Sequence, residues 1–154
     1  MEDRKLEIRR FEKKDEDAVF EVHLKAIGSS GAHLAERDAD FKDIESLYIE
    51  SGGEFLVGMI DGQIVAVGGL KKMTDDIGEI HKMRVHPLFQ QQGFGPAILH
   101  RLEQRARELG FNVLQLDTAV LQTGAQKLYE KNGYKEYKRG EVGGFSCIYY
   151  RKML

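Results

Sequence analysis

Residues 83–98 read MRVHPLFQQQGFGPAI, and this stretch joins a predicted strand to a predicted helix through a glycine turn. A strand-like apolar run from Ile77 to Val85 leads into a short turn that ends in Gly93-Phe94-Gly95, and an amphipathic helix follows at once. A glycine turn before a helix aims backbone N–H groups and the positive end of the helix dipole at one place. Pro96 suits the first helical position, where its missing N–H would have no partner anyway. The stretch therefore predicts a phosphate-binding turn.

Length and composition indicate one compact domain over residues 1–154. The 154 residues are 42% hydrophobic and 31% charged, which suits a chain that buries a core. A net charge of −2 with mixed signs disfavours nucleic acid as a partner. No secretory h-region follows Met1, and no run approaches the ~20 apolar residues of a membrane span. We expect a cytoplasmic protein with no membrane partner.

The single cysteine, Cys147, excludes an internal disulfide and suits a reducing compartment. Its position on a predicted strand favours a small buried core residue. Because no cysteine–histidine ligand spacing occurs, we expect no metal site.

Hydrophobic periodicity and turn residues predict seven strands and four helices. The strands are expected at residues 6–10, 54–60, 63–73, 77–85, 111–118, 134–137 and 145–153. The helices are expected at 15–27, from Asp40 over an apolar stripe to Gly52, at 96–109 and at 123–131. The element order is thus β-α-α-β-β-β-α-β-α-β-β.

One connection in this order is a helical crossover. It joins strands 77–85 and 111–118, which should therefore run parallel. The other neighbours read as antiparallel pairs, with Asp61-Gly62 as a hairpin turn and Gly68-Gly69 as a bulge or a close approach. We expect an α/β (α+β) domain with a mixed, mostly antiparallel sheet of about seven strands and about four helices. A single crossover leaves a cleft at the strand ends, where the glycine turn lies.

Two common phosphate-binding motifs do not fit this turn. A P-loop needs Gly-Lys-Ser/Thr, whereas Gly95 is followed by Pro96-Ala97. A dinucleotide fingerprint needs a third small residue, and Ile98 occupies that position.

A different motif pair does fit. Gln90-x-x-Gly93-x-Gly95 follows Val85-His86-Pro87, and Leu128-Tyr129-Glu130-Lys131-Asn132-Gly133-Tyr134 lies downstream. Together with the element order, these residues resemble the GNAT superfamily of acyl-CoA-dependent N-acetyltransferases, over essentially the whole chain. The resemblance implies transfer of an acetyl group from acetyl-CoA to a primary amine by direct attack in a ternary complex. A catalytically silent acyl-CoA-binding protein with the same fold is the alternative.

The resemblance also implies which residues bind the cosubstrate. Main-chain N–H groups of the turn would bind the CoA pyrophosphate, although Pro96 lacks a donor. Main-chain groups of Met83 and Val85 would hold the pantetheine arm, and the Met83 N–H would polarise the thioester carbonyl. The expected cofactor contacts are Met83, Arg84, Val85, Gln90, Gln91, Gln92, Gly93, Phe94, Gly95, Pro96, Gln122, Tyr129 and Lys131.

Two of these contacts depart from the family or have an ordinary explanation. Gln122 stands where relatives often carry asparagine, and its longer arm can make the same amide hydrogen bonds. Lys131 can meet a CoA phosphate, but an exposed lysine usually belongs to a solvated face.

Three residues are candidates for catalysis. Tyr129 matches the tyrosine that faces the CoA sulfur in relatives, where a phenol with a pKa near ~10 can protonate the leaving thiolate. Packing is its alternative role. The attacking ammonium must lose a proton, and Glu79 lies where many relatives keep a catalytic glutamate that acts directly or through a water. His81 lies on the same side of the strand by alternation and is the alternative base.

The acceptor is expected to be a small-molecule or peptide amine. Its site should lie between the first two helices and the last two strands, near His33, Glu36, Arg37 and Asp38 on one side and Arg139, Glu141 and Phe145 on the other. None of these residues is assigned a role. The closing strands can also pair across a homodimer.

Overall fold

The computed structural model describes residues 5–28 and 39–154. Seven strands form one sheet in the order β1-β2-β3-β4-β5-β7-β6. The strands are β1 (Glu7–Arg10), β2 (Glu54–Ile60), β3 (Gln63–Lys72), β4 (Ile77–Val85), β5 (Val113–Ala119), β6 (Lys135–Val142) and β7 (Phe145–Met153). All pairs are antiparallel except β4 with β5, which confirms the predicted mixed sheet with one parallel crossover.

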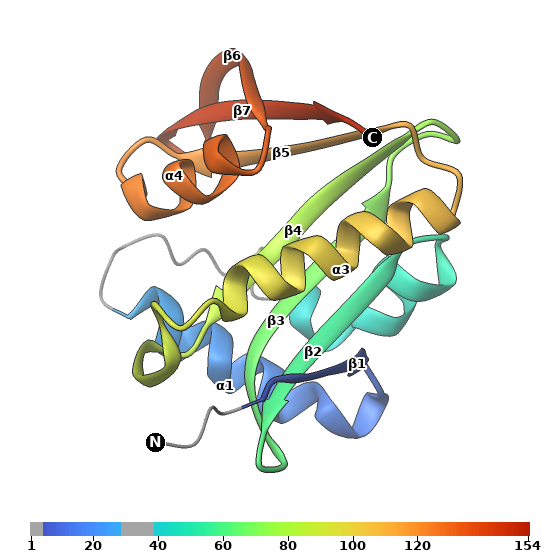
Figure 1. The fold of residues 1–154 in the computed structure, drawn as a ribbon, viewed down its shortest axis with the longest axis vertical. Helices are drawn as coiled ribbons and strands as arrows, with labels where there is room; N and C mark the ends of the chain where they lie inside the picture. Colours follow the sequence, from blue (N-terminus) through green and yellow to red (C-terminus); the bar gives the residue numbers. More distant parts are fainter. Residues whose placement is uncertain (1–4, 29–38) are drawn as a thin grey trace.

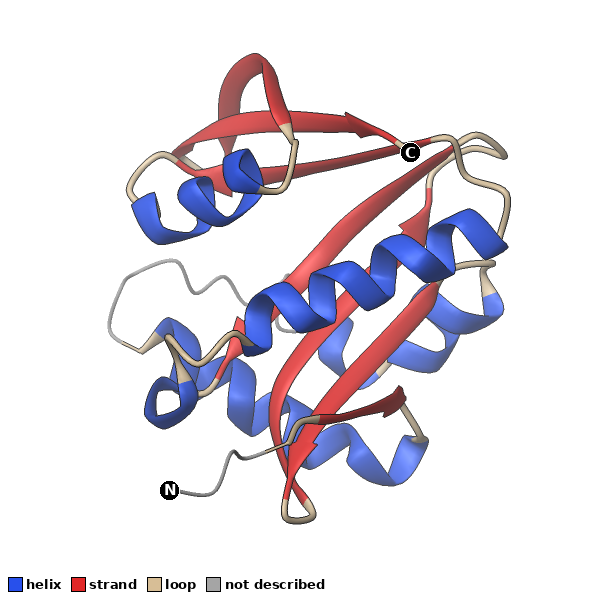
Figure 2. Cartoon of the chain, in the orientation of Figure 1, coloured by secondary structure: helices blue, strands red, loops and turns tan. Residues whose placement is uncertain are grey.

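In the described part of the chain, three α-helices and several short helical turns cover the sheet. Figure 2 shows how these helices lie against the strands. The α-helices are α1 (Glu16–Ile27), α3 (Phe94–Glu108) and α4 (Thr123–Lys131). The shorter elements are the 3-10 turns η1 (Lys13–Asp15), η2 (Asp40–Lys42) and η4 (Pro87–Phe89), and the π-helix η3 (Glu45–Glu50).

The helices lie in two layers, one on each face of the sheet (Figure 1). Helix α3 packs on β2, β3 and β4, while α1 packs on the opposite face. Each layer has its own core, one around Ile98 and Leu102 of α3 and one around Val19 of α1 with Phe41 and Tyr48. All five of these side chains are fully buried or nearly so.

Strands β4 and β5 separate soon after they pair. Their register covers only Ile77↔Val113, Gly78↔Leu114 and Glu79↔Gln115. Figure 1 shows the two strands meeting at one end and diverging toward the other. From Ile80 onward β4 keeps β3 on one side and has no strand on the other. The sheet is therefore split along its middle, in the place where the sequence predicts a cleft.

A β-bulge lies in β4 at the start of the split. The register with β3 shifts between Val67 and Gly69, and Lys82 has a φ of 58°, which is unusual for a residue other than glycine. The bulge turns the side chains of two successive residues to one face: His81 contacts Tyr48, and Lys82 lies over the ring of Phe41. The register shift predicted at Gly68-Gly69 is present, although the extra residue belongs to β4, and the bulge affects which β4 side chains face the cleft.

Gly68 lies opposite this bulge, under helix α3. A Cβ at Gly68 would lie 2.6 Å from the Met83 sulfur and 2.7 Å from Ile98 Cγ2. The missing side chain therefore lets α3 approach the sheet closely beside the cleft.

The predicted start of α3 is wrong by two residues. The helix begins at Phe94 with Gly93 as N-cap, so Pro96 is its third residue. The first backbone bond of the helix runs from the Ala97 N–H to the Gly93 carbonyl at 3.1 Å. Pro96 is tolerated there because the N–H groups of the first turn have no intrahelical acceptor.

Two other predictions need correction. Strand β6 does not end at Tyr137 but continues to Val142, because Gly140 pairs with Cys147 and only Gly143-Gly144 form the turn. Both turn glycines have positive φ, as a two-residue hairpin turn requires. The helix expected from Asp40 is broken into η2 and η3 by Asp43, whose φ and ψ of −144° and 38° are not helical.

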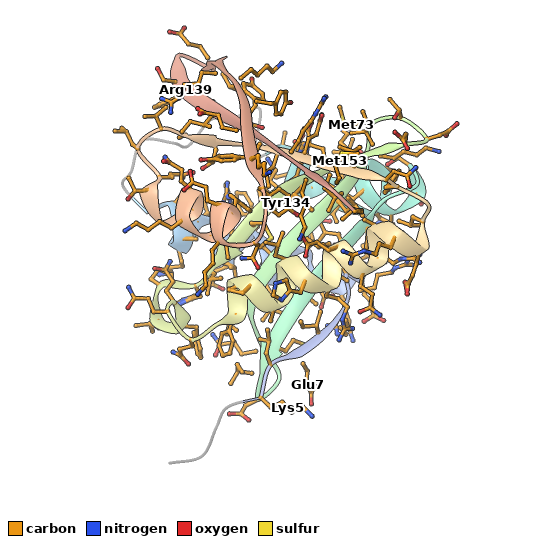
Figure 3. The ribbon with its side chains drawn as sticks, turned by 45° about the horizontal axis from the view of Figure 1, so that its top comes forward. Lys5, Glu7, Met73, Tyr134, Arg139 and Met153 are labelled. Atoms are coloured by element: carbon orange, nitrogen blue, oxygen red, sulfur yellow. The ribbon has the colours of Figure 1, made fainter. Side chains whose placement is uncertain are left out.

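A buried carboxylate joins the two halves of the split sheet through α3. Glu103 of α3 accepts a hydrogen bond from the Tyr134 hydroxyl at 2.9 Å and pairs with Lys152 of β7 at 2.8 Å. Tyr134 lies at the centre of the molecule in Figure 3. Because β7 is bonded to β5 and α3 is packed on β4, this contact connects the two sides of the split sheet near the end where β4 and β5 are paired.

Candidate active site

A cleft of about 520 Å³ lies between the separated strands. On one side it is lined by the first turns of α4 and by Tyr129. On the other side it is lined by Ala26 and Ile27 of α1 and by Phe145 and Cys147 of β7. Because α1 and α4 cover opposite faces of the sheet, the cleft reaches through the sheet from one face to the other.

The glycine turn lies between β4 and α3 and presents unused donors. Gln91 and Gly93 have positive φ, of 61° and 84°. Among the described residues, no group accepts a hydrogen bond from the backbone N–H groups of Gln91 to Gly95. A Cβ at Gly93 would meet nothing within 4 Å, so the space in front of the turn is open. The donor set and the helix dipole suit a bound phosphate or pyrophosphate.

The side chain of Gln90 braces this turn against β4. Its Nε2 donates to the Val85 carbonyl at 3.1 Å, and Arg84 Nη1 donates to the Met83 carbonyl at 2.9 Å. The carbonyls of two residues expected to hold the pantetheine arm are therefore bonded to side chains in this structure. The sulfur of Met83 lies beside Gly68, on the face of the sheet that α3 covers. Met83 also lines the cleft.

Tyr129 lines the cleft from the side of α4. Its ring packs against Tyr134 and Tyr150, at centroid distances of 5.7 and 6.4 Å, and the residue is 6% exposed. No described residue forms a hydrogen bond with its hydroxyl. Burial raises the pKa of this phenol to about 12, while the Arg84 guanidinium acts in the opposite direction. The hydroxyl is protonated at neutral pH and available to a ligand.

Glu79 and His81 form a direct pair, as strand alternation predicts. His81 Nε2 lies 2.6 Å from Glu79 Oε1, and His81 Nδ1 lies 3.5 Å from the Tyr48 hydroxyl. The Glu79 carboxylate also accepts a hydrogen bond from Gln115 Nε2 at 2.7 Å. His81 lines the cleft, whereas Glu79 stands behind it.

The electrostatics of Glu79 follow from these contacts. Burial raises the pKa of the Glu79 carboxyl, but the hydrogen bonds from His81 and Gln115 outweigh burial and hold it below its usual range. A carboxylate with a lowered pKa is a weak base, so Glu79 is better suited to orient His81 than to accept a proton for long.

Two further residues support this pair and are not predicted from the sequence. Gln115 of β5 is fixed in turn by Arg151 of β7, whose Nη2 donates to Gln115 Oε1 at 3.1 Å. Tyr48 comes from η3. The signal for Gln115 is the parallel register Glu79↔Gln115, which no local pattern in the sequence reveals.

The remaining predicted contacts fall in different places. Gln122 is the N-cap of α4, lines the cleft and accepts a hydrogen bond from Thr118 Oγ1 at 3.1 Å. Phe94 presents its side chain to the core, where it is 6% exposed. Lys131 is exposed in the last turn of α4 and does not line the cleft.

Of the residues expected near the acceptor site, the structure places some at the cleft and others away from it. Phe145 lines the cleft, whereas Arg139 lies near the tip of the β6–β7 pair (Figure 3) and bonds Glu136. Cys147 is buried, as predicted, at 3% exposure and faces the cleft. Residues 33, 36, 37 and 38 lie outside the described part of the chain.

Within residues 5–28 and 39–154, no three His, Cys, Asp or Glu side chains are placed to hold a metal ion. In the same part of the chain, no helix combines the length and apolar character that a membrane span requires.

Known proteins are similar to this chain in sequence and in fold. The model of the acetyltransferase (GNAT) family matches residues 17–134. The chain belongs to the GNAT family of acetyltransferases. Members of this family transfer an acetyl group from acetyl-CoA to amine acceptors, and this GNAT protein is an acyltransferase of that kind.

Individual relatives agree with this assignment. The camello protein of Xenopus laevis, which carries an N-acetyltransferase name, is 32% identical over 84% of this chain and 67% of its own length. A GNAT acetyltransferase from Staphylococcus aureus Mu50 has the same fold, with a TM-score of 0.87, 21% identity and coverage of 97% of this chain and 99% of that one. YncA of Salmonella typhimurium, whose structure contains acetyl-CoA, superposes with a TM-score of 0.81 at 19% identity, over 96% and 93% of the two chains.

The lowered pKa of Glu79 predicts how stability depends on pH. The ordinary value for this carboxyl is 4.5, and hydrogen bonds from His81 and Gln115 lower it in the folded protein. The resulting stabilisation is present above pH 4.5 and is lost as the pH falls through the lower, folded value. We expect the stability advantage of the wild type over Glu79→Gln, measured by urea unfolding, to shrink as the pH is lowered from about 6 to about 3.

Asp75→Asn is the control for this measurement. The Asp75 side chain is 99% exposed, so its substitution should change stability by a small amount that varies little with pH. A wild-type advantage over Glu79→Gln that stays constant across the range would contradict the assignment.

Proposed function

We propose that this GNAT protein acetylates a primary amine by direct attack on acetyl-CoA in a ternary complex. One observation carries the proposal: Tyr129 and Gln90 line a cleft that reaches both faces of the sheet, and the unused amide donors of the turn follow Gln90 directly in the chain. A cosubstrate can enter from the side of α3 and α4, and an acceptor can approach the same point from the side of α1.

The turn supports binding of the pyrophosphate. Five successive N–H groups, from Gln91 to Gly95, have no acceptor among the described residues, and the N-terminus of α3 adds its dipole. Pro96 contributes no donor. The fold likeness to YncA, whose structure contains acetyl-CoA, supports the same placement of the cosubstrate.

The split sheet supports binding of the pantetheine arm. Beyond Glu79, β4 has a backbone edge without a strand partner, and an extended arm can lie along such an edge as an added strand. Met83 and Val85 lie on this segment, and the Met83 N–H is our candidate for polarising the thioester carbonyl. Because Gln90 bonds the Val85 carbonyl, its side chain would have to move for that carbonyl to bind the arm.

The reaction requires two proton movements. The acceptor arrives as an ammonium ion and gives one proton to the base. Its nitrogen then forms a bond to the thioester carbonyl carbon, and the carbon–sulfur bond breaks as the tetrahedral intermediate collapses. Tyr129 donates its hydroxyl proton to the leaving sulfur, and the second proton released by the nitrogen restores the phenol. The net products are the N-acetylated amine, CoA thiol and one proton.

The pKa of Tyr129 limits how the proton transfers of this reaction can occur. A phenol with a pKa of about 12 does not readily yield a proton to a thiolate, because thiols ionise near ~8.5. The transfer becomes favourable when the proton from the attacking nitrogen replaces it in the same step. The enclosed position of Tyr129 suits such a concerted exchange.

We assign the base to His81, with Glu79 as its positioning residue. His81 lines the cleft, and Glu79 contacts it from behind at 2.6 Å. A carboxylate in that position fixes the ring and stabilises the imidazolium once the proton has moved.

Replacement of Tyr129 by phenylalanine should slow the reaction without weakening cosubstrate binding. We expect thiol release at saturating acetyl-CoA to fall by about 10²–10⁴-fold, the usual contribution of a general acid, with an unchanged Kd for acetyl-CoA. Tyr137→Phe, at an exposed tyrosine of β6, is the control and should keep full activity. Equal rates would remove Tyr129 from the mechanism. A wild type that binds acetyl-CoA but releases no thiol with any amine would favour the silent CoA-binding alternative.

Replacement of His81 by glutamine should lower the rate of acetyl transfer most strongly at neutral pH. An alkyl ammonium has a pKa near ~10.4, so the need for a base declines as the pH rises toward that value. We expect the rate ratio of wild type to His81→Gln to be large at about pH 7 and to fall steadily toward about pH 9.5. His100→Gln, at an exposed histidine of α3, controls for loss of an imidazole. A ratio that does not change with pH would rule out His81 as the base.

A further inference from the structure

Asp117 stands on the wall of the cleft opposite His81. The last parallel pair of the split sheet is Glu79↔Gln115, and these two side chains share one face because they are hydrogen-bonded. Two residues further along each strand come His81 on β4 and Asp117 on β5, on that same face by strand alternation. Both line the cleft, one on each side of the opening.

The Asp117 carboxylate has no partner among the residues that the structure describes. No described residue donates a hydrogen bond to it or pairs with it, although the residue is partly buried. The buried carboxylates elsewhere are all paired: Asp15 with Arg9, Glu54 with Arg10 and Arg105, and Glu103 with Lys152. The Asp117 carboxylate lines the cleft without such a partner, so it is open to a cationic group of a ligand.

The other charges of the cleft lie on the opposite wall. Lys82 and Arg84 belong to β4, and the Asp40 carboxylate, 3.6 Å from Lys82 Nζ, is already paired. Among the described residues that line the cleft, Asp117 is therefore the carboxylate without a cationic partner, and the two basic side chains of β4 would direct a cation toward β5. The charge of Asp117 also raises the pKa of the Tyr129 phenol, which places the carboxylate near the proposed reaction centre.

We propose that Asp117 binds the ammonium group of the acceptor and selects aliphatic amines. This inference rests on the proposed function. An aliphatic amine, with a pKa near ~10.4, is a cation at neutral pH and gains a charge-assisted hydrogen bond from Asp117. An arylamine is neutral at that pH and gains none. The ammonium held between the two walls faces His81, which can take its proton.

The test measures binding of n-butylammonium chloride to the protein saturated with CoA, by calorimetry at neutral pH. Asp117→Asn keeps the shape of the side chain and removes its charge, and Asp75→Asn is the exposed control. We expect Asp117→Asn to weaken binding by about tenfold or more, which is the size of one charge-assisted hydrogen bond. Binding of aniline and of acetyl-CoA should stay unchanged in both variants, and Asp117→Glu should retain most of the affinity for n-butylammonium.

Two results overturn the proposal: equal affinity of wild type and Asp117→Asn for n-butylammonium, or no saturable binding by the wild type in the millimolar range. Because CoA carries no acetyl group, this binding does not depend on catalysis. If Asp117→Asn loses affinity for n-butylammonium while the wild type releases no thiol with any amine, the ammonium site is supported and only the proposed transfer reaction is refuted.

Discussion

The structure depends on the point where β5 stops pairing with β4. Hydrogen bonding between the two strands ends at Glu79↔Gln115, and each strand then continues with its other neighbour. Separation leaves backbone N–H and C=O groups of β4 without ladder partners, and the two sides of the sheet must then be joined by other restraints. The contact of Glu103 with Tyr134 and Lys152 supplies one such restraint, because it anchors β7 to α3. The cleft is therefore a consequence of topology.

Both layers of helices then contribute to one site. The α3 layer brings the amide turn to the open end of β4, and α4 brings Tyr129 to the same gap. The opposite layer supplies Tyr48, which contacts His81 from η3. The bulge at Lys82 affects both helical layers, because it changes which β4 side chains face each of them. A site assembled through a sheet can separate the route of the cosubstrate from that of the acceptor.

Much of this arrangement is predictable from the sequence because its determinants are local. The glycine turn, the hairpin at Asp61-Gly62 and the approach of Glu79 to His81 all follow from residue type and short-range periodicity, and the structure confirms them. The sequence predicts a shorter β6 and an unbroken second helix, and both predictions are wrong. The pairing of Gly140 with Cys147 and the backbone conformation at Asp43 are set by tertiary contacts. The positions of Gln115 and Asp117 depend on parallel register, which no sequence motif encodes.

The central claim is that the turn before α3 and the free edge of β4 hold acetyl-CoA. Substitution by proline would remove a backbone N–H but would also change the geometry of the turn, so a titration of ¹⁵N-labelled protein with acetyl-CoA, followed by NMR, tests the claim most directly. The account predicts that the largest saturable shifts occur at the amides of residues 91–95, with further shifts at Met83 and Val85. Shifts concentrated elsewhere, for example around the separate cavity lined by Arg9 and Asp15, or no shifts at all, would contradict it.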